Sequence, residues 1–138
     1  MSYDTNNIFA KILRGEIPCK KVYEDPHVLA FEDIRPQAPV HVPVIPKGAY
    51  VSLDDFHEKA SDAEVAAFTR AVGKIARMSG VAESGYRIIA NTGVNGHQEV
   101  PHLHFHVLGG RPLGRVLPRE KAAQAPPVVA CSLVVGYI

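Results

Sequence analysis

The 138-residue sequence lacks tryptophan and contains only two cysteines and two methionines. Cys19 and Cys131 are too few for a disulfide framework, which favours a reduced, cytoplasmic protein. Residues 1–7 lack the basic and apolar regions of a secretory signal, and no apolar run approaches the roughly 20 residues that span a bilayer. A formal net charge of +1 provides no basic surface for nucleic acid. We therefore expect one cytoplasmic domain that binds neither a membrane nor nucleic acid.

Histidine, by contrast, is concentrated in one short segment, where it alternates with apolar residues between positions 102 and 107. Val, Leu and Phe favour an extended chain, so the alternation predicts a strand that ends at Gly109. Side chains two residues apart on a strand point to the same side. One face, toward a cleft or solvent, should carry His102, His104 and His106. The other face, toward the core, should carry Leu103, Phe105 and Val107.

A row of imidazoles fits two kinds of chemistry. Histidine is the commonest metal ligand, and two histidines at i and i+2 can share one zinc ion. However, His102 and His106 would lie about 13 Å apart on a straight strand, which would have to bend before all three rings could bind one ion. A neutral imidazole is also a good nucleophile toward phosphorus near pH 7, and His104 has a neighbouring ring on each side for proton transfer. The nucleophile hypothesis fits better, and a merely solvated polar face is the third alternative.

The segment His102–Val107 resembles the signature of the histidine triad (HIT) superfamily, His-x-His-x-His followed by apolar residues. Residues 4–114 are similar to the Hint branch, the histidine triad nucleotide-binding proteins, nearly from end to end. Further matching segments occur in the right order: 7–12 (NIFAKI), 29–34 (LAFEDI), 36–41 (PQAPVH), 44–47 (VIPK), 85–87 (GYR) and 106–111 (HVLGGR). The resemblance implies a HIT domain over residues 1–115 and a C-terminal extension of unknown role over residues 116–138.

The fold that the resemblance implies is α+β, HIT-like: an antiparallel sheet of about five strands, a long helix packed on it and a short N-terminal helix. Local patterns point the same way. Residues 4–7 offer caps for a helix that Gly15 ends. Ser61 and Glu64 form a capping-box pattern before an apolar stripe, which predicts a helix of roughly 18 residues ending at Gly80.

Strands are expected at three further places. Residues 20–33 predict a β-hairpin with a turn at residues 24–26. Residues 40–45 predict a strand in which Pro43 indicates an irregular or edge position. Residues 86–90 alternate weakly and predict another strand. The apolar residues 128–135 would pair as an edge strand or remain an aggregation-prone tail.

Nucleotide-binding roles outside the histidine segment also follow from the resemblance. It implies an apolar slot for a purine base, formed by Phe9, Ile12, Ile17, Phe31 and Ile34. The Asp33 carboxylate would accept hydrogen bonds from both ribose hydroxyls. The polar loop over residues 91–100 precedes the histidines and can expose N–H groups to a phosphate. Within this loop, the resemblance implies that five residues line the α-phosphate and the ribose: Asn91, His97, Gln98, Glu99 and Val100.

The activity implied is hydrolysis of purine nucleoside 5′-phosphoramidates of the AMP–amine type. His104 would attack the α-phosphorus and form a covalent nucleotidyl-histidine, from which water releases the nucleoside monophosphate. His106 would donate to a phosphoryl oxygen or help to protonate the amine, while His102 and a fourth histidine, His41, would set orientation. The scheme uses no metal and no other cofactor. Hint relatives form homodimers through the long helix and a neighbouring strand, so we expect a homodimer.

Three alternatives stay open: a dinucleoside polyphosphate hydrolase or nucleotide transferase from a sister branch, a nucleotide-binding or scaffold protein without catalysis, and a zinc protein. His106 argues against the transferase branch, which carries Gln at this position. Glu99 departs from the eukaryotic members, which carry Ser. A carboxylate beside a phosphate is repulsive unless it faces a cation, so we hypothesise that Glu99 faces a positively charged leaving amine.

Overall fold

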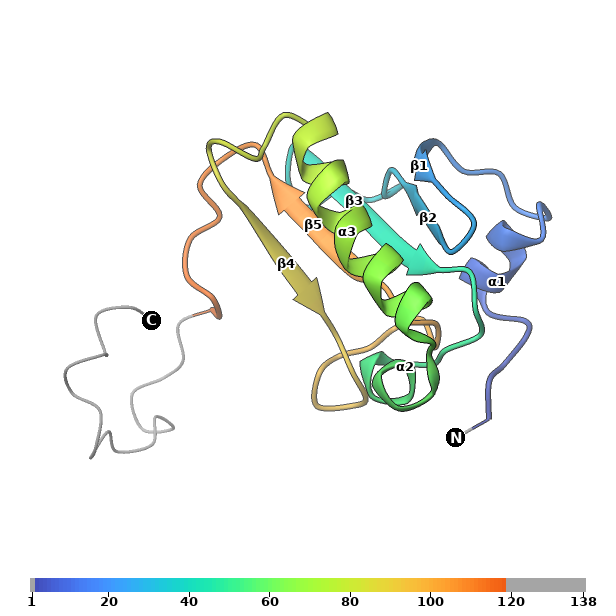
Figure 1. The fold of residues 1–138 in the computed structure, drawn as a ribbon. Coiled ribbons are helices and arrows are strands. Elements are labelled where there is room, and N and C mark those ends of the chain that lie inside the picture. The colour runs from blue at the N-terminus through green and yellow to red at the C-terminus, as the bar shows by residue number, and fades with distance from the viewer. Residues whose placement is uncertain (1, 119–138) are drawn as a thin grey trace, which may run out of the picture.

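A five-stranded antiparallel sheet organises the chain, and the computed structural model describes residues 2–118. The elements are, in order, α1 (Ile8–Leu13), β1 (Lys21–Glu24), β2 (Val28–Phe31), β3 (Val40–Pro46), α2 (Leu53–Lys59), α3 (Asp62–Met78), β4 (Tyr86–Ala90) and β5 (Phe105–Gly109). The strand order across the sheet is β1-β2-β3-β5-β4. Figure 1 shows α3 lying across the sheet and α1 beside β2. The α+β fold predicted from the sequence is confirmed, including the hairpin and both predicted helices.

The long helix α3 has the cap and the apolar stripe that its sequence predicts. Ser61 Oγ accepts from the Glu64 N–H at 3.2 Å, and the Glu64 carboxylate accepts from the Ser61 N–H at 3.1 Å. This reciprocal pair satisfies donors that the first turn of a helix leaves without partners. The face toward the sheet buries Phe68, Ala71, Val72, Ile75 and Ala76.

The two faces of the sheet carry separate apolar clusters, because side chains alternate along each strand. On the α3 face the cluster includes Val28, Ala30, Val42, Val44, Leu103, Val107, Phe68, Val72 and Ile75. On the opposite face a smaller cluster packs Leu29, Phe31 and Ile45 against Phe9, Ile12 and Leu13 of the α1 region. By the same alternation, His41 of β3 and His106 of β5 belong to this second face. These two histidines therefore lie on the face of the sheet that α3 does not cover.

The strand predicted to start at His102 begins later, at Phe105. The N–H groups of His102 and Leu103 donate to the carbonyls of Val100 and Tyr50, at 2.8 Å each, instead of to a neighbouring strand. His102 is fully buried, so the prediction that all three histidines face a cleft or solvent is wrong for this residue. The apolar side of the alternation is confirmed, because Leu103 and Phe105 pack in the α3 cluster.

Pro43 lies in the central strand, where the sequence predicted an irregular or edge position. Peptide groups of odd-numbered residues of β3 point toward β2: the Lys47 N–H donates to the His27 carbonyl, and the His41 carbonyl accepts from the Asp33 N–H. The same register places Phe31 opposite Pro43, so the proline withholds one N–H from the β2 side, and the pairing of β2 with β3 ends at Val44.

The short helix α2 was not predicted. It follows Ser52, and Asp55 occupies the position where a capping box usually carries Glu or Gln. The Asp55 carboxylate accepts from the Ser52 N–H at 2.7 Å. Phe56 is buried with its ring edge-on to Tyr50 and Phe68. The helix closes one end of the core beneath α3.

None of the helices within residues 2–118 has the length and apolar character needed to cross a bilayer. The expected edge strand or tail at residues 128–135, and Cys131 within it, lie outside the described residues. Cys19 is a free thiol.

Candidate active site

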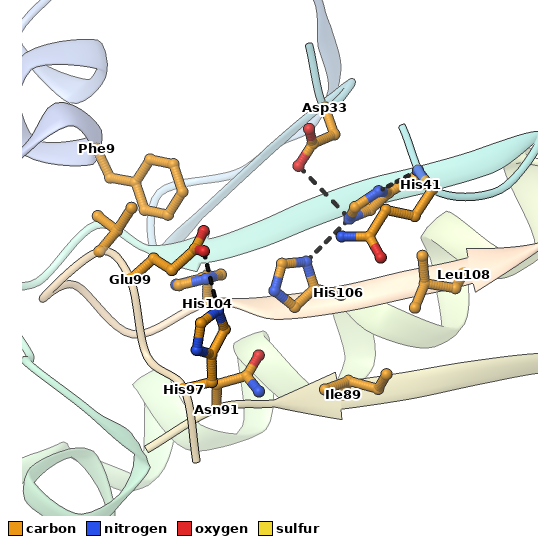
Figure 2. A pocket seen from close by; sticks show the side chains of 12 residues that line it. Phe9, Asp33, His41, Ile89, Asn91, His97, Glu99, His104, His106 and Leu108 are labelled. Atoms are coloured by element: carbon orange, nitrogen blue, oxygen red, sulfur yellow. Dashed lines mark hydrogen bonds and ion pairs between the residues drawn. The ribbon is translucent and has the colours of Figure 1, made fainter. Parts of the chain in front are cut away.

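A cavity of about 440 Å³ opens on the sheet face opposite α3. Its lining comes from α1, three strands and the loops that precede β3 and β5, as Figure 2 shows. The lining residues are Phe9, Asp33, Gln37, His41, Ile89, Asn91, His97, Glu99, Val100, His104, His106 and Leu108. The cavity thus brings together His97 and three of the four histidines predicted to be catalytic, while His102 does not line it.

The hydrogen-bond partner of His104 leaves one of its ring nitrogens free to react. Nδ1 lies 2.8 Å from the carbonyl oxygen of His102. A carbonyl only accepts, so we assign the proton to Nδ1, which leaves a lone pair on Nε2. The ring of Phe9 packs edge-on at 4.9 Å between centroids. Burial lowers the pKa of His104 below its ordinary value of 6.5, which keeps the ring neutral and nucleophilic near pH 7.

Hydrogen bonds link the Gln37 N–H, His41 and His106 in a chain, and the Gln37 N–H decides which ring nitrogens carry the protons. The Gln37 N–H donates to Nδ1 of His41 at 3.1 Å, so the proton of His41 is on Nε2. This Nε2 lies 2.9 Å from Nδ1 of His106, which must accept. The proton of His106 is therefore on Nε2. Burial, with the neighbouring His104 and His41 rings, lowers the pKa of His106 to about 4.

His102 is held at both ring nitrogens and does not line the cavity. Nε2 donates to the Pro46 carbonyl at 2.8 Å, and Nδ1 accepts from the Tyr3 hydroxyl at 2.5 Å. Burial lowers the pKa of His102 to about 4, so this ring is neutral as well. Its contribution to the cavity is its carbonyl, which holds His104.

The ligand atoms of Asp33, His41 and His106 lie within 4.8 Å of one another, which raises the question of a metal site. An ion bound there would require an unprotonated Nε2 on His41, and the proton would have to move to Nδ1. The Gln37 N–H already points at Nδ1 from 3.1 Å, so two donors would then face each other. The donor set of this cluster therefore fits a metal ion poorly.

A second cavity, of about 470 Å³, adjoins the first beside α1. Its lining contains every residue of the predicted purine slot: Phe9, Ile12, Ile17, Phe31 and Ile34. Phe9 and Asp33 line both cavities, so the two are continuous at these residues. Asp33 Oδ1 accepts from the Arg35 N–H at 2.8 Å, and Oδ2 lies 3.5 Å from Nε2 of His41. The Asp33 carboxylate thus lies where the apolar compartment meets the cavity that contains the histidines.

The loop over residues 91–100 is held in shape by its own hydrogen bonds. The Asn91 amide donates to the Gly96 carbonyl at 2.6 Å. A Cβ on Gly96 would meet the Thr92 carbonyl oxygen at 2.4 Å, so this close approach requires glycine. Gln98 is the one predicted loop residue that does not line the cavity. Its amide donates to the Val51 and Val100 carbonyls, at 2.6 and 3.1 Å, and so ties the loop to the segment before α2.

The mouth of the cavity carries an exposed pair. Nε2 of His97 lies 3.0 Å from a carboxylate oxygen of Glu99, and both side chains are more than three-quarters exposed. The dashed line between the two residues in Figure 2 marks this contact. A carboxylate at this position can receive a positively charged group that enters from solvent.

Several contributing residues were not predicted from the sequence. Gln37 and Tyr3 act through single hydrogen bonds to histidines, and no local pattern marks them. Ile89 and Leu108 line the cavity because they occupy alternate positions on β4 and β5, on the same face as His106. Strand alternation could have identified these two once the pairing of β4 with β5 was known.

Comparisons with known proteins agree with this geometry. The family model described as HIT domain matches residues 14–113. A purine nucleoside phosphoramidase of Escherichia coli is 49% identical over 113 residues, which cover 80% of this chain and 92% of that protein. A HIT family hydrolase from Clostridium thermocellum superposes with a TM-score of 0.75 at 42% identity, covering 81% of this chain and 97% of that one. A histidine triad nucleotide-binding protein from Candida albicans gives 0.72 at 31% identity, with coverage of 85% and 86%. The chain belongs to the HIT domain family.

Proposed function

We propose that this protein hydrolyses the P–N bond of purine nucleoside 5′-phosphoramidates through a nucleotidyl-histidine intermediate. The observation that carries the proposal is the 2.8 Å contact of His104 Nδ1 with the His102 carbonyl, which leaves a lone pair on Nε2, in a cavity that continues at Asp33 into an apolar compartment. The similarity to a purine nucleoside phosphoramidase supports the substrate class.

Each part of such a substrate has a matching part of the site. The purine stacks in the apolar cavity, where Phe9 and Phe31 supply aromatic faces. The ribose hydroxyls donate to Asp33. The α-phosphate lies against His104, His106 and the Asn91 loop, and the amine points toward Glu99.

The reaction has two steps. In the first, the lone pair on Nε2 of His104 forms a bond to phosphorus while the bond from phosphorus to the amine nitrogen breaks, and this nitrogen takes up a proton from solvent as it leaves. The Nε2–H of His106 donates to a phosphoryl oxygen as charge develops on it. In the second step, water attacks phosphorus and His104 is released. Over both steps one water molecule is consumed: one proton reaches the amine, and the hydroxyl stays on phosphorus as part of the nucleoside monophosphate.

We further propose that the HIT domain extends to residue 115 and acts in the cytoplasm as a homodimer. The sheet edge at β4 is consistent with a partner, since Tyr86 and Ile88 on this strand are 39% and 43% exposed. The proposed interface combines β4 with α3.

Intact-protein mass spectrometry after rapid quenching tests the proposed function. With adenosine 5′-phosphoramidate we expect an adduct of the mass of AMP, located on His104 by peptide mapping. The matched control, His104→Ala, should form no adduct, should lose at least about 10³-fold in kcat, and should still bind AMP in calorimetry. Turnover without an adduct would contradict the covalent mechanism. Binding of AMP without turnover by the wild-type protein would instead identify a non-catalytic nucleotide-binding protein.

A further inference from the structure

The residue with the most unexpected contact is Tyr3, which precedes α1 and lines neither of the two cavities. Its hydroxyl lies 2.5 Å from Nδ1 of His102, which is 99 positions away in the sequence. The two rings also pack edge-on, with 5.5 Å between centroids and 71° between planes. A residue near the N-terminus therefore contacts the histidine segment directly.

The segment that carries Tyr3 is anchored next to this contact. The Asp4 carbonyl accepts from the side-chain amide of Asn7 at 2.7 Å and from the Asn7 N–H at 3.3 Å. Asn7 is itself buried and caps α1, accepting from the Ala10 N–H at 2.9 Å. These bonds fix the backbone beside Tyr3 relative to the helix that also carries Phe9. The N-cap residue of α1 thus anchors the backbone next to Tyr3.

The hydroxyl supplies what the buried His102 ring requires. The Pro46 carbonyl accepts from Nε2, so the proton of the neutral ring is there and Nδ1 carries a lone pair. A buried acceptor without a donor is unfavourable, and the Tyr3 O–H provides the donor. With a bond at each nitrogen, the ring has one tautomer and one orientation.

The His102 carbonyl accepts from Nδ1 of His104 at 2.8 Å. It belongs to the same peptide group as the Leu103 N–H, which donates to the Tyr50 carbonyl at 2.8 Å. His102 is therefore held on its backbone side by Tyr50 and on its side-chain side by the two bonds to its ring. A hydrogen bond to one ring nitrogen decides which nitrogen carries the lone pair. The chain of contacts from Tyr3 through His102 therefore ends at Nε2 of His104.

We propose that Tyr3 is a positioning residue for the nucleophile: its hydroxyl donates to Nδ1 of His102 and so stabilises the tautomer that the Pro46 carbonyl selects. The His102 residue held in this way presents the carbonyl that keeps the Nε2 lone pair of His104 directed into the cavity. The consequence for turnover rests on the proposed phosphoramidase function. The consequence for the tautomers does not, since it concerns the protein without substrate.

Tyr3→Phe tests the proposal, because it removes only the O–H and keeps the ring and its edge-on contact. Removal of the hydrogen-bond partner of a metal-ligating histidine costs about 10-fold or more, and we expect kcat on adenosine 5′-phosphoramidate to fall by about 10-fold when His102 loses its partner. KM should change less than about twofold, since Tyr3 does not touch the cavities. The matched control is Tyr23→Phe on β1, away from the histidines, which loses a 2.8 Å hydrogen bond to Asp25 in the following turn and should keep the wild-type kcat.

Nitrogen-15 NMR of histidine-labelled protein supplies the second measurement. In the wild type, His102 should show a single neutral tautomer with its proton on Nε2. In Tyr3→Phe the Nδ1 signal should shift and the His104 signals should move with it, while in Tyr23→Phe both should stay in place. Unchanged signals in Tyr3→Phe, or an equal fall of kcat in both variants, would overturn the proposal. Absence of turnover in the wild type would contradict the proposed function alone, because the NMR result would still decide the role of Tyr3.

Discussion

Nε2 of His41 lies 2.9 Å from Nδ1 of His106, although 65 positions separate the two residues in the sequence. The register pairs His41 with Leu108 and Pro43 with His106, so the two histidines are diagonal neighbours on one face of β3 and β5. The Gln37 N–H occupies the other nitrogen of His41. The sheet and one backbone donor therefore fix which nitrogen of His106 carries its proton.

The first prediction concerns this link. His41→Ala removes the donor to His106 and should lower kcat on adenosine 5′-phosphoramidate by about 10-fold or more, because the tautomer of His106 is no longer fixed. His41→Gln should recover part of the loss, since an amide can both accept from Gln37 and donate to His106. Steady-state kinetics of the two variants provide the measurement. An equal loss of kcat in both variants would show that the hydrogen-bond chain is not what matters at His41.

The second prediction is that acid weakens the folded state in a defined window. The pKa values of His102 and His106 are about 4 in the folded protein, against an ordinary value of 6.5. Between pH 6.5 and 4 the unfolded chain therefore binds more protons, and the free energy of unfolding falls as the pH falls. The stabilisation is fully present above pH 6.5. For the fully buried His102 it is on the order of 3 kcal/mol.

Urea unfolding at pH 7, 5.5 and 4.5 measures this effect, and the midpoint should fall at each step. Carboxylates with lowered pKa, such as Glu64, lose their contribution at still lower pH and so do not account for a change above pH 5. A midpoint that stays constant from pH 7 to 4.5 would contradict the buried, neutral state of these histidines.

Local sequence patterns predicted those helices and strands that are determined by residues close together in the chain. Ser61 and Glu64 lie three residues apart, so the cap of α3 is visible in the sequence. The alternation of apolar residues and histidines likewise placed Phe105 and Val107 on the core face of the strand and His106 on the opposite face. The same rule predicted a strand that starts too early, at His102 and not at Phe105. The Leu103 N–H donates to the carbonyl of Tyr50, which is distant in the sequence, and not to a neighbouring strand.

The detailed chemistry of the site depends on single backbone groups that no pattern marks. The Pro46 carbonyl, the Gln37 N–H and the His102 carbonyl decide the tautomers of His102, His41 and His104, and the Tyr3 hydroxyl supplies the donor that His102 then needs. Periodicity and capping rules reveal none of these contacts. The residue types of the site could thus be predicted from the sequence, whereas the proton positions required the fold.

The third prediction concerns the ribose. Asp33→Asn retains the shape of the side chain but weakens acceptance from hydroxyl groups, because a neutral amide oxygen is a poorer acceptor than a carboxylate. We expect kcat/KM for the ribonucleoside phosphoramidate to fall by about 10-fold, as for loss of one or two charged hydrogen bonds. The 2′,3′-dideoxy substrate serves as the control and should be nearly unaffected. A similar fall for both substrates would mean that Asp33 acts through His41, from which Oδ2 lies 3.5 Å away, and not through the ribose.

The fourth prediction concerns the choice of leaving amine. Glu99 lines the histidine cavity, yet its side chain is 77% exposed, so it can meet a charge on the amine that projects toward solvent. Glu99→Gln keeps the shape and removes the charge. AMP linked to 1,3-diaminopropane carries a second, protonated amine at pH 7, whereas AMP linked to butylamine does not.

Exposed ion pairs contribute about 0.2–1 kcal/mol, so Glu99→Gln should reduce the kcat/KM ratio of the charged over the neutral substrate by about 1.4- to 5-fold. The difference should shrink at 1 M salt, where the Debye length is about 3 Å. Glu83→Gln, on the turn before β4, is the matched control and should leave the ratio unchanged. Equal changes for both substrates in Glu99→Gln would show that the carboxylate acts on the phosphate or on His97, and not on the leaving amine.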